Sequence, residues 1–500
     1  NEYNVVDTPT GTNGLYVAIS AADEVINFNG HKIYKNNDAS FYNNANGRLI
    51  MYNERNASSK AYITVDESAA YRAELSHTLI NAKRLELISG SEFYGNPTFE
   101  ISGLKFAKNS TASIINMDNN VALSSMYLLG AHIKDNTNGR IVAPSKGYSY
   151  IIDTKFGTTT EGNELELIED EKYNDALLTF NNITKATIKY YTYTDNAFVG
   201  NKARNLIKVS GNYDTLADET NPLITIENAG FIENVSYEWL STGVEATTSI
   251  IEIAENASTE EQIIALSNVK AHDNDDSAGR FGTFIRSYGH RVKLTDVEIT
   301  DNTFYKYIVE QHKAKNIEQL QYRLKKVLIS DNTLSYAYST TDFNAGIALY
   351  QDYVDESENL GFAGSINSIE MATISNNRVN AAILNSAGAM NYTFGGKVYI
   401  KGNNDQSSKE HNLAVYGSSN ERQTVAFLSD AYTDIWDTDS SLLSTDSEIG
   451  VTVVDMTSTT PYKDIAYQTW KETIKEKAQV FNKVFSSDDS NYIIAKRVLG

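Results

Sequence analysis

Alternating apolar and polar residues, each run closed by a short polar turn, recur along most of this chain. The stretch Val292–Thr303 reads VKLTDVEITDNT, and Leu324–Thr333 repeats the same pattern as LKKVLISDNT. A period of two with one apolar face indicates a β-strand that is buried on one side. Because the unit recurs, the pattern predicts a solenoid in which each copy forms part of one rung.

Ten copies of this unit can be aligned on the polar residue that ends the strand. Nine of the ten are Asn; the set is Asn109, Asn136, Thr159, Asn196, Asn234, Asn274, Asn302, Asn332, Asn377 and Asn403. The residues three and five positions earlier are nearly all apolar or aromatic. Because Asn tolerates a positive φ better than most residues, we expect it to make the turn. We also expect equivalent Asn side chains to hydrogen-bond in a ladder along the stack.

The pattern divides the chain into four parts. Residues 1–100 are expected to form an N-terminal cap and early rungs, residues 101–405 the parallel β-helix rungs, and residues 406–460 the last rungs. After Pro461, apolar residues at steps of three to four positions predict one α-helix. These residues are Ala466, Trp470, Ile474, Ala478, Phe481 and Phe485. With a strand over Asn491–Arg497, the helix would cap the stack over residues 461–500, because an open strand edge pairs with other chains.

Composition agrees with an all-β chain and excludes several classes of function. Asn, Thr, Ser, Tyr and Gly are abundant and there are only 5 Pro, which suits strands joined by tight polar turns. The absence of Cys excludes disulfides and thiolate metal sites. A net charge of −21 disfavours nucleic acid as a partner. No apolar run reaches the roughly 18 residues needed to cross a bilayer, so we expect no membrane insertion. The chain opens at Asn1 without a basic and apolar signal segment, as expected of a cytosolic or an already processed protein.

Four segments near the end of the chain carry a resemblance. They read GGKVYIKGNND (Gly395–Asp405), HNLAV (His411–Val415), SEIGVTVVD (Ser447–Asp455) and VFSSDDSNY (Val484–Tyr492). In this order they resemble the closing blocks of right-handed parallel β-helix (pectin-lyase-like) proteins on the surface of anaerobic gut-type bacteria. Those proteins are called adhesin-like or polymorphic-membrane-protein-like. The resemblance implies a right-handed parallel β-helix in an extracellular, cell-surface location, and it implies little about the ligand.

One acidic cluster is a candidate calcium site. Asp273, Asp275 and Asp276 lie close together, although the central Gly and terminal Glu of an EF-hand loop are absent. Basic residues follow within the same and the next copy: Arg280, Arg286, His290, Arg291, Arg323, Lys325 and Lys326. Enzymes that act on polysaccharides need grouped carboxylates or calcium beside a base. An acidic turn beside a solvated basic strand explains the same residues without a ligand.

The remaining chemistry is sparse. The seven His form no metal-binding motif, and neither a nucleophile elbow nor a phosphate-binding glycine loop is present. We therefore assign no catalytic residue and no cofactor other than the candidate calcium.

Tyrosines are the candidate ligand-binding residues. Flat aromatic rings on a rigid sheet can stack on sugar rings or fill a protein interface. The candidates are Tyr190, Tyr336, Tyr338, Tyr350 and Tyr353. Tyr also fits pleated surfaces and stacks with itself between rungs, which requires no ligand.

The favoured hypothesis is a non-enzymatic bacterial cell-surface β-helix that acts in adhesion or recognition of a glycan or protein. A polysaccharide lyase or glycoside hydrolase on the same scaffold is one alternative. A surface-layer or filament subunit that functions by self-association is another.

Overall fold

Strands, bridges and turns account for the secondary structure of the described chain. The computed structural model describes residues 2–4, 23–34, 40–53, 60–64, 74–90, 98–108, 110–118, 123–166, 176–211, 222–236, 248–254, 263–274, 281–312, 322–336, 346–352, 366–385, 391–416, 424–427, 444, 446–454, 481–485 and 491–496. These residues contain no helix, and so none that could span a bilayer.

The strands have the following bounds. They are β1 (Glu2–Asn4), β2 (Asp23–Asn27), β3 (Lys32–Tyr34), β4 (Tyr42–Tyr52), β5 (Ala61–Thr64), β6 (Ile80–Ile88), β7 (Phe99–Ser102), β8 (Ile115–Asn116), β9 (Ser125–Leu129), β10 (Ala131–Lys134), β11 (Ile141–Val142), β12 (Tyr148–Ile152), β13 (Lys155–Phe156), β14 (Ala176–Asn181), β15 (Lys185–Val199), β16 (Asn205–Ser210), β17 (Ile224–Ile232), β18 (Ser249–Ile253), β19 (Ile263–His272), β20 (Thr283–Tyr288), β21 (Arg291–Thr300), β22 (Thr303–Phe304), β23 (Tyr307–His312), β24 (Tyr322–Ser330), β25 (Thr333–Leu334), β26 (Ile347–Asp352), β27 (Ile366–Glu370), β28 (Thr373–Ser375), β29 (Ala381–Asn385), β30 (Asn391–Gly395), β31 (Tyr399–Lys401), β32 (Leu413–Tyr416), β33 (Thr424–Phe427), β34 (Glu448–Val454), β35 (Phe481–Phe485) and β36 (Asn491–Lys496).

The chain divides into two compact units. Unit 1 comprises Asn1–Glu260 and Asn268–Phe281, and unit 2 comprises Glu261–Ser267 and Gly282–Gly500.

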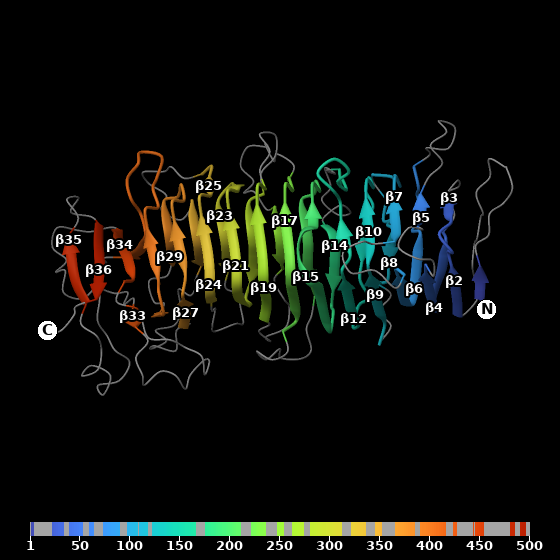
Figure 1. Cartoon of the computed structure of the whole chain (residues 1–500), viewed down its shortest axis with the longest axis horizontal. Helices are drawn as coiled ribbons and strands as arrows, with labels where there is room; N and C mark the ends of the chain where they lie inside the picture. Colours follow the sequence, from blue (N-terminus) through green and yellow to red (C-terminus); the bar gives the residue numbers. More distant parts are fainter. Residues whose placement is uncertain are drawn as a thin grey trace. The chain divides into compact units, whose positions relative to one another are not determined.

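In unit 1, each strand pairs in parallel with its equivalent one rung later, in three rows. The first row is β2, β4, β6, β9, β12, β15 and β17. The second contains β3, β5, β7, β10 and β13, of which β3, β5, β7 and β10 can be followed side by side in Figure 1. The third contains β8, β11, β14, β16 and β18. Consecutive strands such as β9, β10 and β11 fall in different rows, so the chain winds around an axis as a parallel β-helix. The predicted all-β fold class is confirmed.

Alternate side chains fill the interior of each rung. In β12 the burial pattern alternates from exposed Tyr148 to buried Ser149 and Ile151, as a half-buried strand requires. Equivalent inward residues stack between rungs: the rings of Phe156 and Phe198 lie 4.7 Å apart at 9°. Phe198 and Phe231 continue the stack at 4.8 Å and 4°. Each such aromatic pair contributes about 0.5–1.5 kcal/mol beyond the burial of its surface.

An asparagine ladder runs through unit 1, as expected. Its members are Asn136, Asn163, Asn201, Asn234 and Asn274. Each Nδ2 donates to the Oδ1 of the next Asn at 2.9–3.1 Å. Each Nδ2 also donates to a main-chain carbonyl of the preceding rung; for example, Asn163 donates to Ile133 O at 2.8 Å. The ladder therefore satisfies amide groups that burial would otherwise leave unpaired.

Unit 2 contains a second ladder of the same design. It joins Asn302, Asn332, Asn377 and Asn403, and ends at the Oδ1 of Asn412. The four side chain to side chain hydrogen bonds measure 2.9–3.0 Å.

Two of the ten predicted anchors are wrong, and a third, Asn109, lies outside the described residues. Thr159 and Asn196 are exposed, and the ladder uses Asn163 and Asn201 instead. The turn after Phe156 contains extra residues, and β15 shifts register twice against β17 before Phe198. Counting a constant distance from the strand therefore finds the wrong polar residue.

The expected backbone role of the ladder Asn is also wrong. Positive φ occurs at the residue immediately before eight of the nine ladder Asn, with Asn163 as the exception: Asp135 (52°), Gly200 (65°), Glu233 (53°), Asp273 (55°), Asp301 (56°), Asp331 (59°), Asn376 (57°) and Gly402 (73°). A left-handed residue at this position turns the corner and directs the next side chain inward. Gly and Asp accept this conformation more readily than most residues. The ladder Asn is thus selected for its side chain and not for its φ.

Unit 2 also pairs its strands in parallel until the C-terminal end. One row contains β21, β24, β27, β30 and β33, a second contains β28, β31 and β34, and a third contains β20, β23, β26, β29 and β32. The last strands break the pattern, because β36 pairs antiparallel with both β34 and β35.

The C-terminal predictions meet different outcomes. The predicted strand over Asn491–Arg497 is confirmed as β36, which ends at Lys496. Residues 455–480, where most of the predicted helix falls, lie outside the described residues. Phe481 and Phe485 belong to β35, so the helix does not extend to them as predicted. The backbone of β35 pairs with β36 at these residues. This strand pairing determines the local structure, although the spacing of the apolar residues would also suit a helix.

Candidate functional site

The candidate calcium cluster is only partly within the described chain. Asp273 follows β19, its side chain is 63% exposed, and its Oδ2 lies 2.8 Å from Nδ1 of His272. Asp275 and Asp276 lie outside the described residues. Among the residues that the structure describes, no group of three or more His, Asp or Glu is arranged to hold a metal ion.

The basic residues near this cluster separate into three environments. Arg286 is buried, and its Nε donates to Glu310 at 2.7 Å. His290 is also buried. Arg291, Arg323 and Lys325 are only partly buried on β21 and β24, and Lys326 pairs with Asp296 at 3.5 Å. Arg280 lies outside the described residues.

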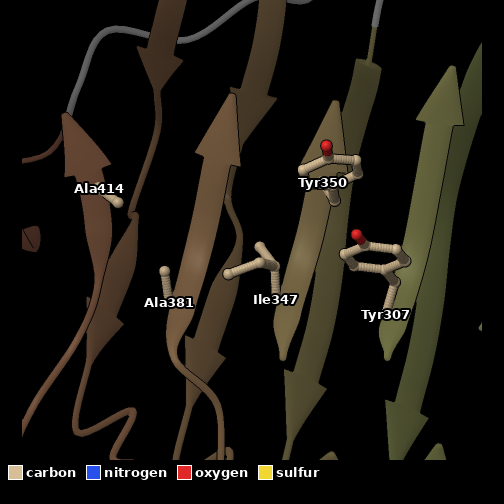
Figure 2. Packing of buried hydrophobic residues seen from close by; sticks show 5 residues of the cluster. All are labelled: Tyr307, Ile347, Tyr350, Ala381 and Ala414. Carbon is tan, nitrogen blue, oxygen red and sulfur yellow. The ribbon is translucent and has the colours of Figure 1, made fainter. Parts of the chain in front are cut away.

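Two of the candidate tyrosines are interior residues. Tyr190 is 1% exposed, and its hydroxyl donates to the main-chain carbonyl of Thr154. Burial, reinforced by the charge of Asp153, raises the pKa of Tyr190 well above its usual value. Tyr350 is 5% exposed, and its ring stacks on Tyr307 at 4.4 Å, as Figure 2 shows. Neither ring presents a face to a ligand in solution.

The other candidate tyrosines do not assemble into a site either. Tyr336 is partly buried and meets the ring of Tyr305 edge-on at 5.4 Å. Tyr338 and Tyr353 lie outside the described residues.

A different group of tyrosines lies together on the outer surface of unit 1. We call it the tyrosine face, and it comprises the outward side chains of the four adjacent strands β4, β6, β9 and β12. Its aromatic and aliphatic members are Ile50, Tyr52, Ile88, Tyr127, Leu129, Tyr148, Tyr150 and Ile152. All of them are partly or largely exposed and alternate with buried residues. An outward sheet face this rich in apolar side chains is typical of a binding surface.

The centre of the tyrosine face is a pair of stacked rings. Tyr127 and Tyr150 are register partners on β9 and β12, and their rings lie 5.1 Å apart at 13°. The guanidinium of Arg84 lies 5.7 Å from the centre of the Tyr127 ring. Arg84 also pairs with Glu86 at 2.6 Å, and Arg48 pairs with the same carboxylate at 3.2 Å. These ion pairs fix the Arg84 side chain beside the Tyr127 ring.

The stack leaves one ring face of Tyr150 directed toward the next strand. Stacked rings in this fold lie face to face along the rungs, as in the stack of Phe156, Phe198 and Phe231. Tyr127 therefore covers one side of Tyr150, and Thr187 is the register partner of Tyr150 on its other side. Because Thr is much smaller than Tyr, the surface steps down beside the Tyr150 ring. Thr225 of β17 is the register partner of Thr187, so the lower surface continues for one more rung.

Charged side chains border this step on both sides. Lys185 lies opposite Tyr148, two residues before Thr187. Lys189 lies two residues after Thr187 and pairs with Glu227 of the next rung at 2.7 Å. The hydrogen bond from Lys189 to Glu227 raises the pKa of Lys189. Burial, followed by the neighbouring Tyr127 and Tyr148, raises the pKa of Tyr150, so its hydroxyl remains a neutral donor at physiological pH.

The step thus combines an aromatic wall, a floor of two hydroxyl-bearing side chains and charged hydrogen-bonding groups at its rim. A planar, partly apolar molecule with polar edges can stack on Tyr150 while its edges bind Thr187 and the flanking Lys side chains.

The sequence contained a signal for this face, but the tyrosine candidates were not chosen with it. Tyr127 and Tyr150 are separated by the same interval as Ile133 and Phe156, which are register partners in the adjacent row. Applying the anchor alignment to the preceding strand would have placed the two Tyr side by side. Strand parity would also have placed Tyr150 outward and Tyr190 inward, because Tyr190 lies two residues after the buried Ile188.

Comparisons with known proteins add no family to this picture, since no protein-family model, no curated protein and no solved structure matches the chain.

Proposed function

We propose that this protein is a non-enzymatic recognition protein of a bacterial cell surface, and that the tyrosine face of unit 1 binds a glycan chain. The observation that carries the proposal is the partly exposed Tyr150 ring, stacked on Tyr127 on one side and in register with the small Thr187 on the other, with Thr225 one rung further. An adhesin-like role and an extracellular location agree with the resemblance of the closing segments and with the acidic, Cys-free composition.

A sugar is the ligand that the chemistry of the step favours. The apolar face of a pyranose ring stacks on an aromatic ring, and its hydroxyls need donors and acceptors around the edge. Tyr150 supplies the ring, and Lys185, Thr187 and Lys189 supply polar groups along the neighbouring strand β15. Because the rungs repeat along the sheet, a polymer with repeating units can contact several rungs at once, which raises its apparent affinity.

The test uses a panel of neutral polysaccharides and two matched Tyr variants. We expect at least one glucan, mannan or galactan to retard the wild-type protein in affinity gel electrophoresis. Tyr150→Ala is expected to weaken that binding by about tenfold, because the stacking surface is lost. Tyr62→Ala provides the control, since Tyr62 is partly exposed on β5, which belongs to the second row of unit 1 and not to the tyrosine face.

The same measurements decide against the proposal in two ways. Absence of retardation by every polysaccharide in the panel contradicts a glycan-binding face. Equal weakening by Tyr150→Ala and Tyr62→Ala contradicts the assignment of the site to Tyr150.

A further inference from the structure

Unit 2 carries a compact group of basic side chains on the outward side of two neighbouring strands. We call it the basic patch, and it consists of Arg291 and Lys293 on β21 with Arg323 and Lys325 on β24. All four alternate with buried residues such as Val292 and Leu324, and so they point away from the interior.

The register places these cations unusually close to one another. Lys293 and Arg323 are direct partners across the two strands. Neighbouring strands lie about 4.8 Å apart, and residues two apart along a strand lie about 6.6 Å apart. The patch therefore offers positive charge at three successive levels along roughly 13 Å of strand. Like charges directly opposite each other repel, so an anion that lies between Lys293 and Arg323 would reduce this repulsion.

On the neighbouring strand β27, a carboxylate lies in register with one member of the patch. Glu370 of β27 lies opposite Lys325, whereas the partner of Arg323 on the same strand is the neutral Ser368. No ion pair joins Lys293 to any other residue that the structure describes. The whole chain carries a net charge of −21, so a cluster of four cations on adjacent strands is the opposite of what its composition provides elsewhere.

We propose that the basic patch binds an anionic glycan, through sulfate or carboxylate groups that lie between Lys293 and Arg323. The guanidinium of Arg323 can donate a charge-assisted hydrogen bond to either group, and the ammonium of Lys293 adds a point charge from the opposite strand. Arg291 and Lys325 bind the next anionic groups along the chain. This inference is independent of the tyrosine face, because it concerns different residues and a different class of glycan.

The patch fits an anionic glycan better than a nucleic acid. Single-stranded nucleic acid is bound by basic grooves with aromatic side chains on which the bases stack. The outward residues of the patch and its immediate neighbours Thr295 and Ser368 include no aromatic side chain. Duplex DNA carries a charge every 1.7 Å or so and requires an extended positive surface, which a chain of net charge −21 opposes.

The experiment measures binding of the whole chain to four immobilised polymers. They are a sulfated dextran, a polyuronate, unmodified dextran and double-stranded DNA. The test variants are Lys293→Gln alone, Lys293→Gln combined with Arg323→Gln, and Lys325→Gln alone. Lys397→Gln is the matched control, because it removes one charge from an exposed side chain of unit 2 that pairs with Asp446.

We expect wild-type protein to bind the sulfated dextran, the polyuronate or both, with an affinity that falls as salt is added. Preference for one of the two identifies the anionic group. The double variant is expected to bind at least about tenfold more weakly, since each charged hydrogen bond contributes more than that factor when desolvated. Lys325→Gln should lose a smaller part of the affinity for the anionic polymers. Lys397→Gln should bind them as tightly as wild type, and none of the substitutions should change binding to unmodified dextran.

Stability separates a binding role from a structural one. Removal of one like charge from an opposed pair should leave the melting temperature of Lys293→Gln unchanged or higher at low salt. The proposal is overturned if Lys293→Gln has a lower melting temperature and its weaker binding is fully explained by the fraction of unfolded protein. It is also overturned by absence of binding to both anionic glycans, an equal loss in Lys397→Gln, or equally tight binding of DNA through the same residues.

Discussion

Asn332 shows what a single ladder residue contributes to unit 2. Its Nδ2 donates to Asn377 Oδ1 at 2.9 Å and to Ile299 O at 2.7 Å. Its Oδ1 accepts from the main-chain N and the Nδ2 of Asn302 at 3.1 and 2.9 Å. We expect Asn332→Ala to lower the free energy of unfolding by about 2–4 kcal/mol, because several buried polar groups lose their partners at once. Urea unfolding followed by circular dichroism measures the change.

Asn196→Ala is the control for this substitution. Asn196 is exposed and lies outside the ladder, so its replacement should change the free energy of unfolding by less than about 0.5 kcal/mol. Similar midpoints for Asn332→Ala and wild type would show that the ladder does not contribute to stability.

The ladder also shows which of its members can be predicted from spacing in the sequence and which cannot. Spacing from the last buried strand residue identified Asn136, Asn234 and Asn332, because those turns are equally short. It failed at Asn163 and Asn201, where the turn or the strand contains extra residues. Gly162 illustrates a constraint that spacing cannot express: an added Cβ would lie 1.7 Å from Gly200 O of the next rung. That close contact exists only after the rungs have stacked.

At the scale of elements, β20 and β23 are joined by a buried ion pair. Arg286 and Glu310 are both nearly fully buried, and His312 contacts the second carboxylate oxygen of Glu310. Burial alone would raise the pKa of Glu310, but the charge of Arg286 and the hydrogen bond from His312 hold it below its usual value. Removing one partner of such a pair leaves the other charge buried and unpaired. We therefore expect Glu310→Gln to lower the free energy of unfolding by roughly 3–5 kcal/mol at pH 7.

The pH dependence of this loss follows from the direction of the pKa shift. A carboxylate with a lowered folded pKa contributes its full stability above its unfolded pKa, near 4.3, and loses it as the pH falls through the folded value. The difference between wild type and Glu310→Gln should therefore shrink as the pH is lowered from 7 to about 3. Glu448→Gln, which breaks the more exposed pair with Lys401, should cost less than about 1 kcal/mol. A difference for Glu310→Gln that stays constant with pH would exclude ionisation as its origin.

Strand parity explains why the element type was predicted better than the site. Alternation in VKLTDVEI reported correctly which side chains of β21 are buried. The tyrosine candidates were chosen by local density, and density does not distinguish the inward Tyr190 from the outward Tyr150. The tyrosine face forms only when β9 and β12 come into register, so its members are scattered in the sequence. Register is a property of the stacked rungs and depends on turn lengths that single strands do not reveal.

At the scale of the whole molecule, the two proposed binding surfaces belong to different units and differ in chemistry. The tyrosine face is apolar with a charged rim. The basic patch is a positively charged region on a chain whose net charge is −21. In a solenoid each rung contacts mainly its neighbours, so a surface substitution in one unit should not alter the other. Tyr150→Ala should therefore leave binding of the sulfated dextran and the polyuronate unchanged, and Lys293→Gln should leave binding of neutral polysaccharide unchanged.

The combined variant makes this expectation quantitative. Tyr150→Ala with Lys293→Gln should lose affinity for both classes of glycan, and each loss should equal that of the single variant within about 0.5 kcal/mol, as for sites with no shared partner. Affinity gel electrophoresis with both polymers at the same ionic strength provides the comparison. If Lys293→Gln weakens neutral binding as much as anionic binding, both variants act on a property of the whole chain, such as its net charge, and neither surface is a separate site.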